Sequence, residues 1–256
     1  MQAGGTADAN QPAYHYRAIR DAAIRVLQNR RYDYPHRLIL LGLLCEQLDL
    51  LMKEQASREI PAFLASFEEE LDSGLANNEE LRNYAAFPRD TAYQIRTLNQ
   101  YLMRKLESTI WNLRYKACVA DYMKGMTRQG NQTEQIVRQY EEAYAVHLQP
   151  FMEEHPYFFE NYVVNAVFGS FLAGMQQGIG IYEQYKLLVI DYAMIKLHII
   201  GLAAHRGELT AESAVELVQC YTKNYEHAAS YRRDLLRELA EDGRDTLNDL
   251  VLLITN

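Results

Sequence analysis

Glycine and proline, on which most tight turns depend, are scarce in this sequence. The 256 residues contain 13 glycines and 6 prolines, whereas an average chain of this length would hold about 30 of the two together. A chain with few turn residues must be built from long elements. Apolar residues recur at spacings of three and four, as in Ile19, Ala23 and Val26, and no useful run alternates as a strand would. The sequence therefore predicts an all-α protein, a compact multi-helix bundle of roughly nine or ten helices.

The chain is expected to form one large unit. Residues 1–13 lack the basic start and the apolar run of a signal peptide and predict a disordered tail. Residues 14–256 predict a single helical domain, with a possible subdomain break at 129–132, where glycine and polar residues interrupt the helical pattern. Five residues are predicted to cap the helices that follow them: Ser57, Asp90, Thr133, Thr210 and Asp245.

Charge and hydropathy narrow the classes of partner. The net charge of −8 disfavours a nucleic-acid partner, because a surface that binds phosphates is basic. The most apolar stretch, 187–204, contains Asp191, Lys196 and His198, whereas a membrane span needs about 20 largely uncharged residues. We therefore expect no membrane span and a cytoplasmic location.

The three cysteines are Cys45, Cys118 and Cys220, and none begins a CxxC pair. An odd, scattered set argues against a disulfide framework and against a zinc site. The sequence also lacks a phosphate-binding loop, a dinucleotide fingerprint that follows a strand, a nucleophile elbow and a His-Glu-x-x-His pair. No catalytic residue, no metal ligand and no cofactor held by this chain alone is predicted.

The most informative polar feature lies in the long apolar segment 181–205, which predicts a buried helix. Asp191 and His198 stand seven residues apart on one stripe, and Tyr192 and Lys196 stand four apart on a second stripe. Charged groups on so apolar a helix need partners. Two interpretations remain open: a satisfied buried network, or the polar wall of a pocket.

Three segments resemble the C-terminal region of flagellin lysine-N-methylases. They are Phe159-Glu160-Asn161-Tyr162-Val163-Val164-Asn165, Tyr192-Ala193-Met194-Ile195-Lys196-Leu197-His198-Ile199-Ile200-Gly201, and Lys223 with Tyr225-Glu226-His227, which Tyr221-Thr222 precedes as a looser match. The resemblance extends over roughly 14–254, and its most specific part is the segment 192–201. The cysteine-rich N-terminal half of that family has no counterpart in these residues.

The resemblance implies methylation of flagellin lysines by an enzyme that depends on S-adenosylmethionine, with an iron–sulfur cluster in its cysteine-rich half. A cluster usually needs about four thiolates brought together, so this chain is expected to be inactive as a methyltransferase by itself. The expected role is substrate docking or another accessory role, with flagellin or the cysteine-rich catalytic half as partner. The alternative is a stand-alone helical domain that binds a protein or a small ligand without enzymatic activity.

Together the matched segments and the polar stripes give one set of candidate residues for a polar pocket or a docking surface. The set is Glu160, Asn161, Asn165, Asp191, Tyr192, Lys196, His198, Glu226 and His227.

Overall fold

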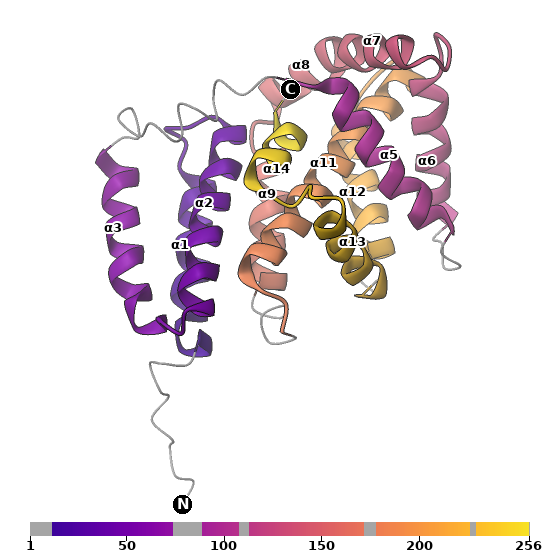
Figure 1. Cartoon of the computed structure of the whole chain (residues 1–256). Coiled ribbons are helices and arrows are strands. Elements are labelled where there is room, and N and C mark those ends of the chain that lie inside the picture. The colour runs from indigo at the N-terminus through magenta and orange to yellow at the C-terminus, as the bar shows by residue number, and fades with distance from the viewer. Residues whose placement is uncertain (1–11, 74–88, 108–112, 172–177, 226–228, 256) are drawn as a thin grey trace, which may run out of the picture. The chain divides into compact units, whose positions relative to one another are not determined.

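The computed structural model describes residues 12–73, 89–107, 113–171, 178–225 and 229–255, and most of these residues are helical (Figure 1). Within these ranges there is no strand, which confirms the predicted all-α class with about ten helices. The contacts between Cα atoms divide the chain into two compact units. The first is Met1–Phe87 with Glu160–Leu188, and the second is Pro88–Phe159 with Val189–Asn256.

The first unit is built around α1. Its helices are α1 (Pro12–Gln28), α2 (Tyr34–Lys53), α3 (Ile60–Ser73), most of α9 (Phe158–Ala166) and the π-helical turn η4 (Val167–Phe171), and a 3-10 turn (Ser57–Glu59) precedes α3. Helix α1 packs against α2, α3 and η4. Pro35 lies in the first turn of α2 and Asp33 caps that helix by accepting from the amide of His36 at 3.0 Å, as expected of a helix start. Residues 1–11 of the predicted tail lie outside the described residues.

The second unit contains the remaining helices. They are α5 (Thr91–Glu107), α6 (Leu113–Met126), α7 (Thr133–Ala143), the π-helical turn η3 (Tyr144–Leu148), α8 (Gln149–Glu154), α12 (Ala211–Tyr225), α13 (Ala229–Glu241), α14 (Leu247–Ile254) and the larger part of α11 (Ile181–Arg206). Helix α6 packs against α7 and α12, and α5 packs against α7 and α14. The predicted subdomain break at 129–132 lies inside this unit, as the turn between α6 and α7, where Gly130 has a φ of 126°.

The predicted caps are confirmed at two helices. Asp90 accepts from the amide of Tyr93 at 2.8 Å, and Thr210 accepts from the amide of Ser213 at 3.2 Å. The predictions for Thr133 and Asp245 are wrong by one residue. The prediction for Ser57 is also wrong, because Ser57 lies inside the 3-10 turn before α3 and its buried hydroxyl bonds to no amide there.

The actual caps are Gln132 and Thr246. In each helix, the side chain of the residue three positions after the cap explains why the helix begins there. The side chains of Gln135 and Asp249 accept from the backbone N–H groups of Gln132 and Thr246, both at 3.2 Å, and such reciprocal bonds fix where a helix begins.

Helix α11 is the apolar centre of the chain. It is long and apolar enough to cross a membrane, but 94% of its most apolar window is buried inside the protein. Its apolar residues from Leu187 to Ala204 are all less than 5% exposed. A helix that is apolar on every side is stable in water only when other helices cover it, so α11 is the core helix that the sequence predicted.

Helices α6 and α11 approach closely at a pair of glycines. A β-carbon on Gly125 would lie 1.8 Å from the carbonyl oxygen of Gly201, and one on Gly201 would lie 2.4 Å from the ring of Tyr122. Neither position has space for a methyl group. The crossing therefore requires glycine on both helices, and it brings Tyr122 against α11.

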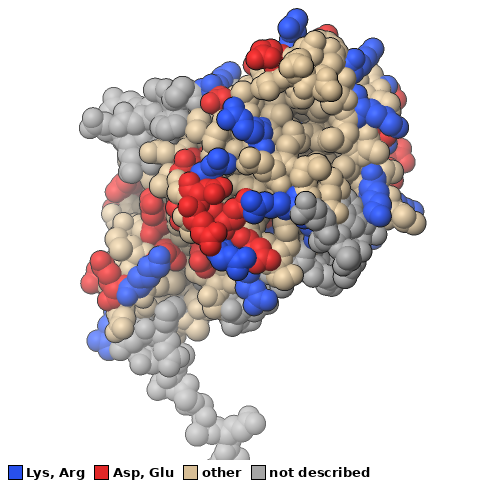
Figure 2. Space-filling view, turned by 45° about the vertical axis from the view of Figure 1, so that its right-hand side comes forward, with Lys and Arg blue, Asp and Glu red and all other residues tan. Residues whose placement is uncertain are grey.

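Charged side chains are unevenly spread over the surface. Figure 2 shows a face on which acidic side chains gather into a patch, with basic side chains at its border or standing apart from it. This distribution accords with the net charge of −8. That nucleic acid is not a partner stays a prediction.

We expect Gly125→Ala and Gly201→Ala each to lower the free energy of unfolding by about 1–3 kcal/mol, because an added methyl group forces the two helices apart. Urea unfolding followed by circular dichroism measures the change. Gly169→Ala is the matched control, since a β-carbon there meets nothing within 4 Å. Equal stability of the Gly125 variant, the Gly169 variant and the unmodified chain would contradict the close crossing.

Candidate functional site

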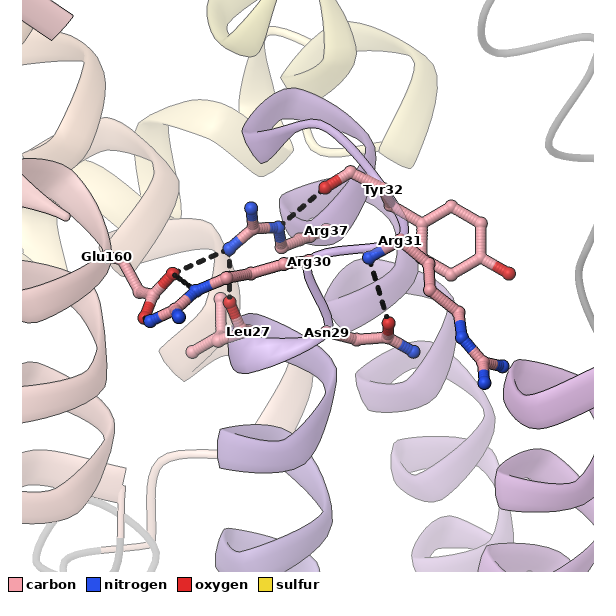
Figure 3. A network of polar contacts seen from close by, with 7 residues as sticks. All are labelled: Leu27, Asn29, Arg30, Arg31, Tyr32, Arg37 and Glu160. Carbon is pink, nitrogen blue, oxygen red and sulfur yellow. Dashed lines mark hydrogen bonds and ion pairs between the residues drawn. The ribbon is translucent and has the colours of Figure 1, made fainter. Parts of the chain in front are cut away.

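A buried carboxylate joins α9 to the end of α1 and the start of α2 (Figure 3). The side chain of Glu160 is 4% exposed, and its carboxylate accepts hydrogen bonds from two arginines. Arg37 donates from Nη1 to Oε2 at 2.7 Å, and Arg30 donates from Nη2 to Oε1 at 2.9 Å. Charge-assisted bonds of this length are among the stronger ones in proteins. Glu160, one of the candidate residues named from the sequence, is thus the centre of a three-residue ion cluster.

Arg37 also fixes the backbone that leads from α1 to α2. Its guanidinium donates to the carbonyl oxygen of Leu27 at 3.1 Å and to that of Tyr32 at 2.8 Å. Asn29 helps to shape the same connection by accepting from the amide of Arg31 at 3.2 Å. The planar fork of arginine suits several acceptors at once, so Arg37 holds the helix end, the connection and Glu160 together.

The cluster keeps Glu160 ionised. Burial acts to raise the pKa of this carboxyl, but hydrogen bonds and charge from Arg30 and Arg37 outweigh it, and the pKa is lowered. The cluster carries one net positive charge, and Arg30, whose side chain is 56% exposed, presents it to solvent. On the same helix Asn161 and Asn165 are both exposed and lie four residues apart, which places their amides on one face.

In the second unit, Lys196 is buried and bound to the end of α14. Its Nζ donates to the carbonyl oxygens of Leu253 at 3.3 Å and Ile254 at 3.1 Å, and it lies 5.4 Å from the ring centroid of Tyr192. Burial lowers the pKa of Lys196 to about 7. The carbonyls at a helix C-terminus and the face of a tyrosine ring both favour an ammonium group. Lys196 therefore attaches α14 to α11.

His198 is enclosed by tyrosines from α6. Its Nδ1 donates to the carbonyl oxygen of Met194 at 2.6 Å, and its Nε2 accepts from the hydroxyl of Tyr115 at 3.3 Å. The ring of Tyr122 lies 4.9 Å away, between centroids. Burial lowers the pKa of His198 to about 4, although the Met194 carbonyl favours the protonated ring. The histidine is therefore a neutral core residue at pH 7.

Asp191 links α11 to two further helices. One of its oxygens accepts from the hydroxyl of Tyr221 on α12 at 2.8 Å, and the other accepts from Arg232 on α13 at 2.8 Å. The carboxylate has a side-chain exposure of 14% and the arginine has one of 27%. Both oxygens have a positively polarised partner, as a partly buried carboxylate requires.

The structure gathers four of the nine candidate residues, Asp191, Tyr192, Lys196 and His198, in the second unit. The polar groups of Asp191, Lys196 and His198 bond to neighbouring helices, which favours the interpretation of these three as a satisfied network over that of a pocket wall. Glu160, Asn161 and Asn165 belong to the first unit. Glu226 and His227 lie outside the described residues. Whether any of the nine binds a partner stays a prediction.

Sequence reasoning missed the partners of these residues. Arg30, Arg37 and Arg232 complete the ion pairs, and Tyr115 and Tyr221 complete the hydrogen bonds. One signal was available: 19 tyrosines against 8 phenylalanines indicate many rings that carry a polar tip. Which tyrosine meets which residue of α11 depends on packing and has no local signature.

The cysteines do not fit the ligand set of an iron–sulfur cluster. Cys45, Cys118 and Cys220 are all buried and free. Burial raises the pKa of Cys45 well above its usual value and that of Cys118 to about 11, whereas a cluster ligand must be a thiolate. Within the described ranges, no group of three or more His, Cys, Asp or Glu side chains is placed to hold a metal ion. We therefore assign no step of any reaction to a cluster in these residues.

Comparison with protein families gives one match, and it covers most of the chain. The family model for the FliB lysine N-methylase C-terminal domain matches residues 20–253. Neither the curated proteins nor the solved structures give a match. The resemblance first noted in the segments 159–165 and 192–201 therefore extends over both units.

We expect Glu160→Gln to destabilise the chain by about 3–5 kcal/mol, because it leaves the buried guanidinium of Arg37 without its counter-charge. Arg30→Met should have a much smaller effect, since the Arg30 side chain is half-exposed. Thermal and urea unfolding of both variants measure the difference. Two equal effects would contradict the assignment of Arg37 as the central partner.

Acid should destabilise the folded chain through His198. Between pH 6.5 and 4 the unfolded chain binds a proton at this histidine while the folded chain does not, so the free energy of unfolding falls as the pH falls. Across that window the unmodified chain should lose about 3 kcal/mol more than His198→Gln. Urea titrations at several pH values test this, and parallel pH profiles would refute it.

Proposed function

The chain belongs to the FliB lysine N-methylase C-terminal domain family, and from this membership we propose that it docks flagellin for the methylation of its lysines. The observation that carries the proposal is the match over residues 20–253. The lysine methylation named by the family requires a protein substrate to be held. The proposed role of this chain is to hold it.

The chemistry of the chain supports a binding role over a catalytic one. The polar groups on the buried part of α11 bond to neighbouring helices: Lys196 to the end of α14, His198 to Tyr115, and Asp191 to Tyr221 and Arg232. A group that transfers a proton or a methyl group must be within reach of its substrate. These groups instead hold helices in position.

A second polypeptide segment completes the proposed activity. That segment, rich in cysteine, would hold S-adenosylmethionine and an iron–sulfur cluster, which the three buried thiols of this chain do not fit. The two segments would share the reaction, since one presents the flagellin chain and the other transfers the methyl group.

Purified chain on beads should retain monomeric flagellin, and a cysteine-rich segment of the same family should methylate flagellin lysines faster when this chain is added. Mass spectrometry of the flagellin lysines measures methylation. Serum albumin, another acidic helical protein, replaces the chain in the control. Retention of flagellin without a gain in methylation would favour a stand-alone interaction domain. If flagellin is not retained and its methylation does not increase, the proposal is wrong.

A further inference from the structure

A groove in the second unit has the size of a ligand site. Its volume is about 550 Å³, within the range of roughly 300–1,000 Å³ that is common for binding pockets. It is lined by Ala92, Ile95, Arg96, Asn99, Gln100, Met103 and Arg104 of α5, by Thr133 and Ile136 of α7, and by Glu238, Asp242 and Arg244 in and after α13. None of the residues predicted as candidate sites lines it.

One face of α5 forms the long wall of the groove. The lining residues of α5 follow one another at spacings of one and three from Ala92 to Arg104, which keeps them on a single face of the helix. At a rise of 1.5 Å per residue this wall is about 18 Å long. An extended peptide of about five or six residues has that length.

Two amides on this wall accept hydrogen bonds from other side chains of the chain. Asn99 accepts from the hydroxyl of Tyr122 at 2.5 Å, and Gln100 accepts from Arg244 at 3.3 Å. An amide whose oxygen is engaged has its NH₂ group left to donate. The wall therefore offers hydrogen-bond donors one residue apart, and these suit the carbonyl oxygens of a peptide backbone.

The charges of the groove leave one cation in excess. Arg104 pairs with Glu238, and Arg244 and Asp242 add one charge of each sign. Arg96 is exposed, and among the described residues it has no ion-pair partner. Its guanidinium can bind a carboxylate in two-point fashion.

Apolar side chains stand beside these donors. Met103 is 51% exposed, and Ile95 and Ile136 also line the groove. Methionine is flexible and adapts to different apolar partners. The groove can therefore cover apolar side chains of the bound segment without demanding one particular shape.

We propose that this groove binds an extended peptide segment that carries a carboxylate side chain. The carboxylate binds Arg96, the peptide carbonyls accept from Asn99 and Gln100, and apolar side chains contact Met103 and Ile136. The inference rests on the proposed function, because flagellin is then the polypeptide that supplies the segment.

Methyl NMR on the full chain tests the proposal, with labelled methionine and isoleucine methyl groups. The probes are three pools of capped hexapeptides, with aspartate, asparagine or lysine fixed at one position and varied residues elsewhere. The aspartate pool should shift the methyl signals of Met103 and Ile136 and leave that of Met123 in place. The asparagine and lysine pools should bind at least tenfold more weakly.

Arg96→Glu should weaken binding of the aspartate pool at least tenfold. Arg138→Glu is the matched control, because Arg138 is also exposed, lies on the neighbouring helix α7 and does not line the groove. Absence of shifts at Met103 and Ile136, equal binding of the three pools, or equal effects of the two substitutions would overturn the proposal.

The flagellin assay separates this inference from the function on which it rests. If Arg96→Glu retains flagellin as well as the unmodified chain does, docking takes place elsewhere and only the groove assignment fails. If the aspartate pool binds the groove but flagellin is not retained, the groove stands as a peptide site and the flagellin proposal fails.

Discussion

Asp191, Lys196 and His198 lie on the stretch of α11 from Leu187 to Ala204, which is otherwise apolar and buried. A charged or polar group in such a place is stable only with partners, because removal from water costs several kcal/mol. Lys196 meets that need at the end of α14, His198 at α6, and Asp191 at α12 and α13. The positions of four helices around α11 are thereby tied to specific atoms, whereas apolar packing alone would tolerate many arrangements.

The abundance of tyrosine has the same physical basis. A tyrosine ring fills the core as phenylalanine does, and its hydroxyl satisfies a buried polar group that a phenylalanine would leave unpaired. Tyr231 illustrates this, since its hydroxyl donates to the carbonyl oxygen of Tyr101 at 3.1 Å. Its ring and that of Tyr225 each lie 4.9 Å from the ammonium of the buried Lys105. The second unit thus holds two buried lysines against tyrosine faces.

Charged and polar side chains serve two different purposes in this chain. In the first unit, Arg37 gathers one carboxylate and two backbone carbonyls and so stabilises a connection between helices. In the second unit, the wall of α5 leaves Arg96 and two amide groups facing a groove of about 550 Å³. Groups that are already paired hold the fold, and groups that keep unused donors are the ones able to bind a partner. This distinction separates the buried network of α11 from the groove along α5.

The sequence by itself determined the helical class, because few glycines and prolines and a period of three to four leave no other regular structure. It also determined that α11 is buried and, through the segments 159–165 and 192–201, the family. It placed caps correctly where one side chain dominates, as at Asp90, and missed by one residue where a side chain three positions further on decides, as at Thr246.

Only the tertiary structure decided which partners the polar residues have. Glu160 meets an arginine 123 residues earlier, and Lys196 meets carbonyls 57 and 58 residues later, and no local pattern encodes such distances. The groove is likewise a product of packing, since its lining comes from three separated segments. Periodicity and caps act over one or two helical turns, whereas partners and cavities depend on where whole helices come to lie.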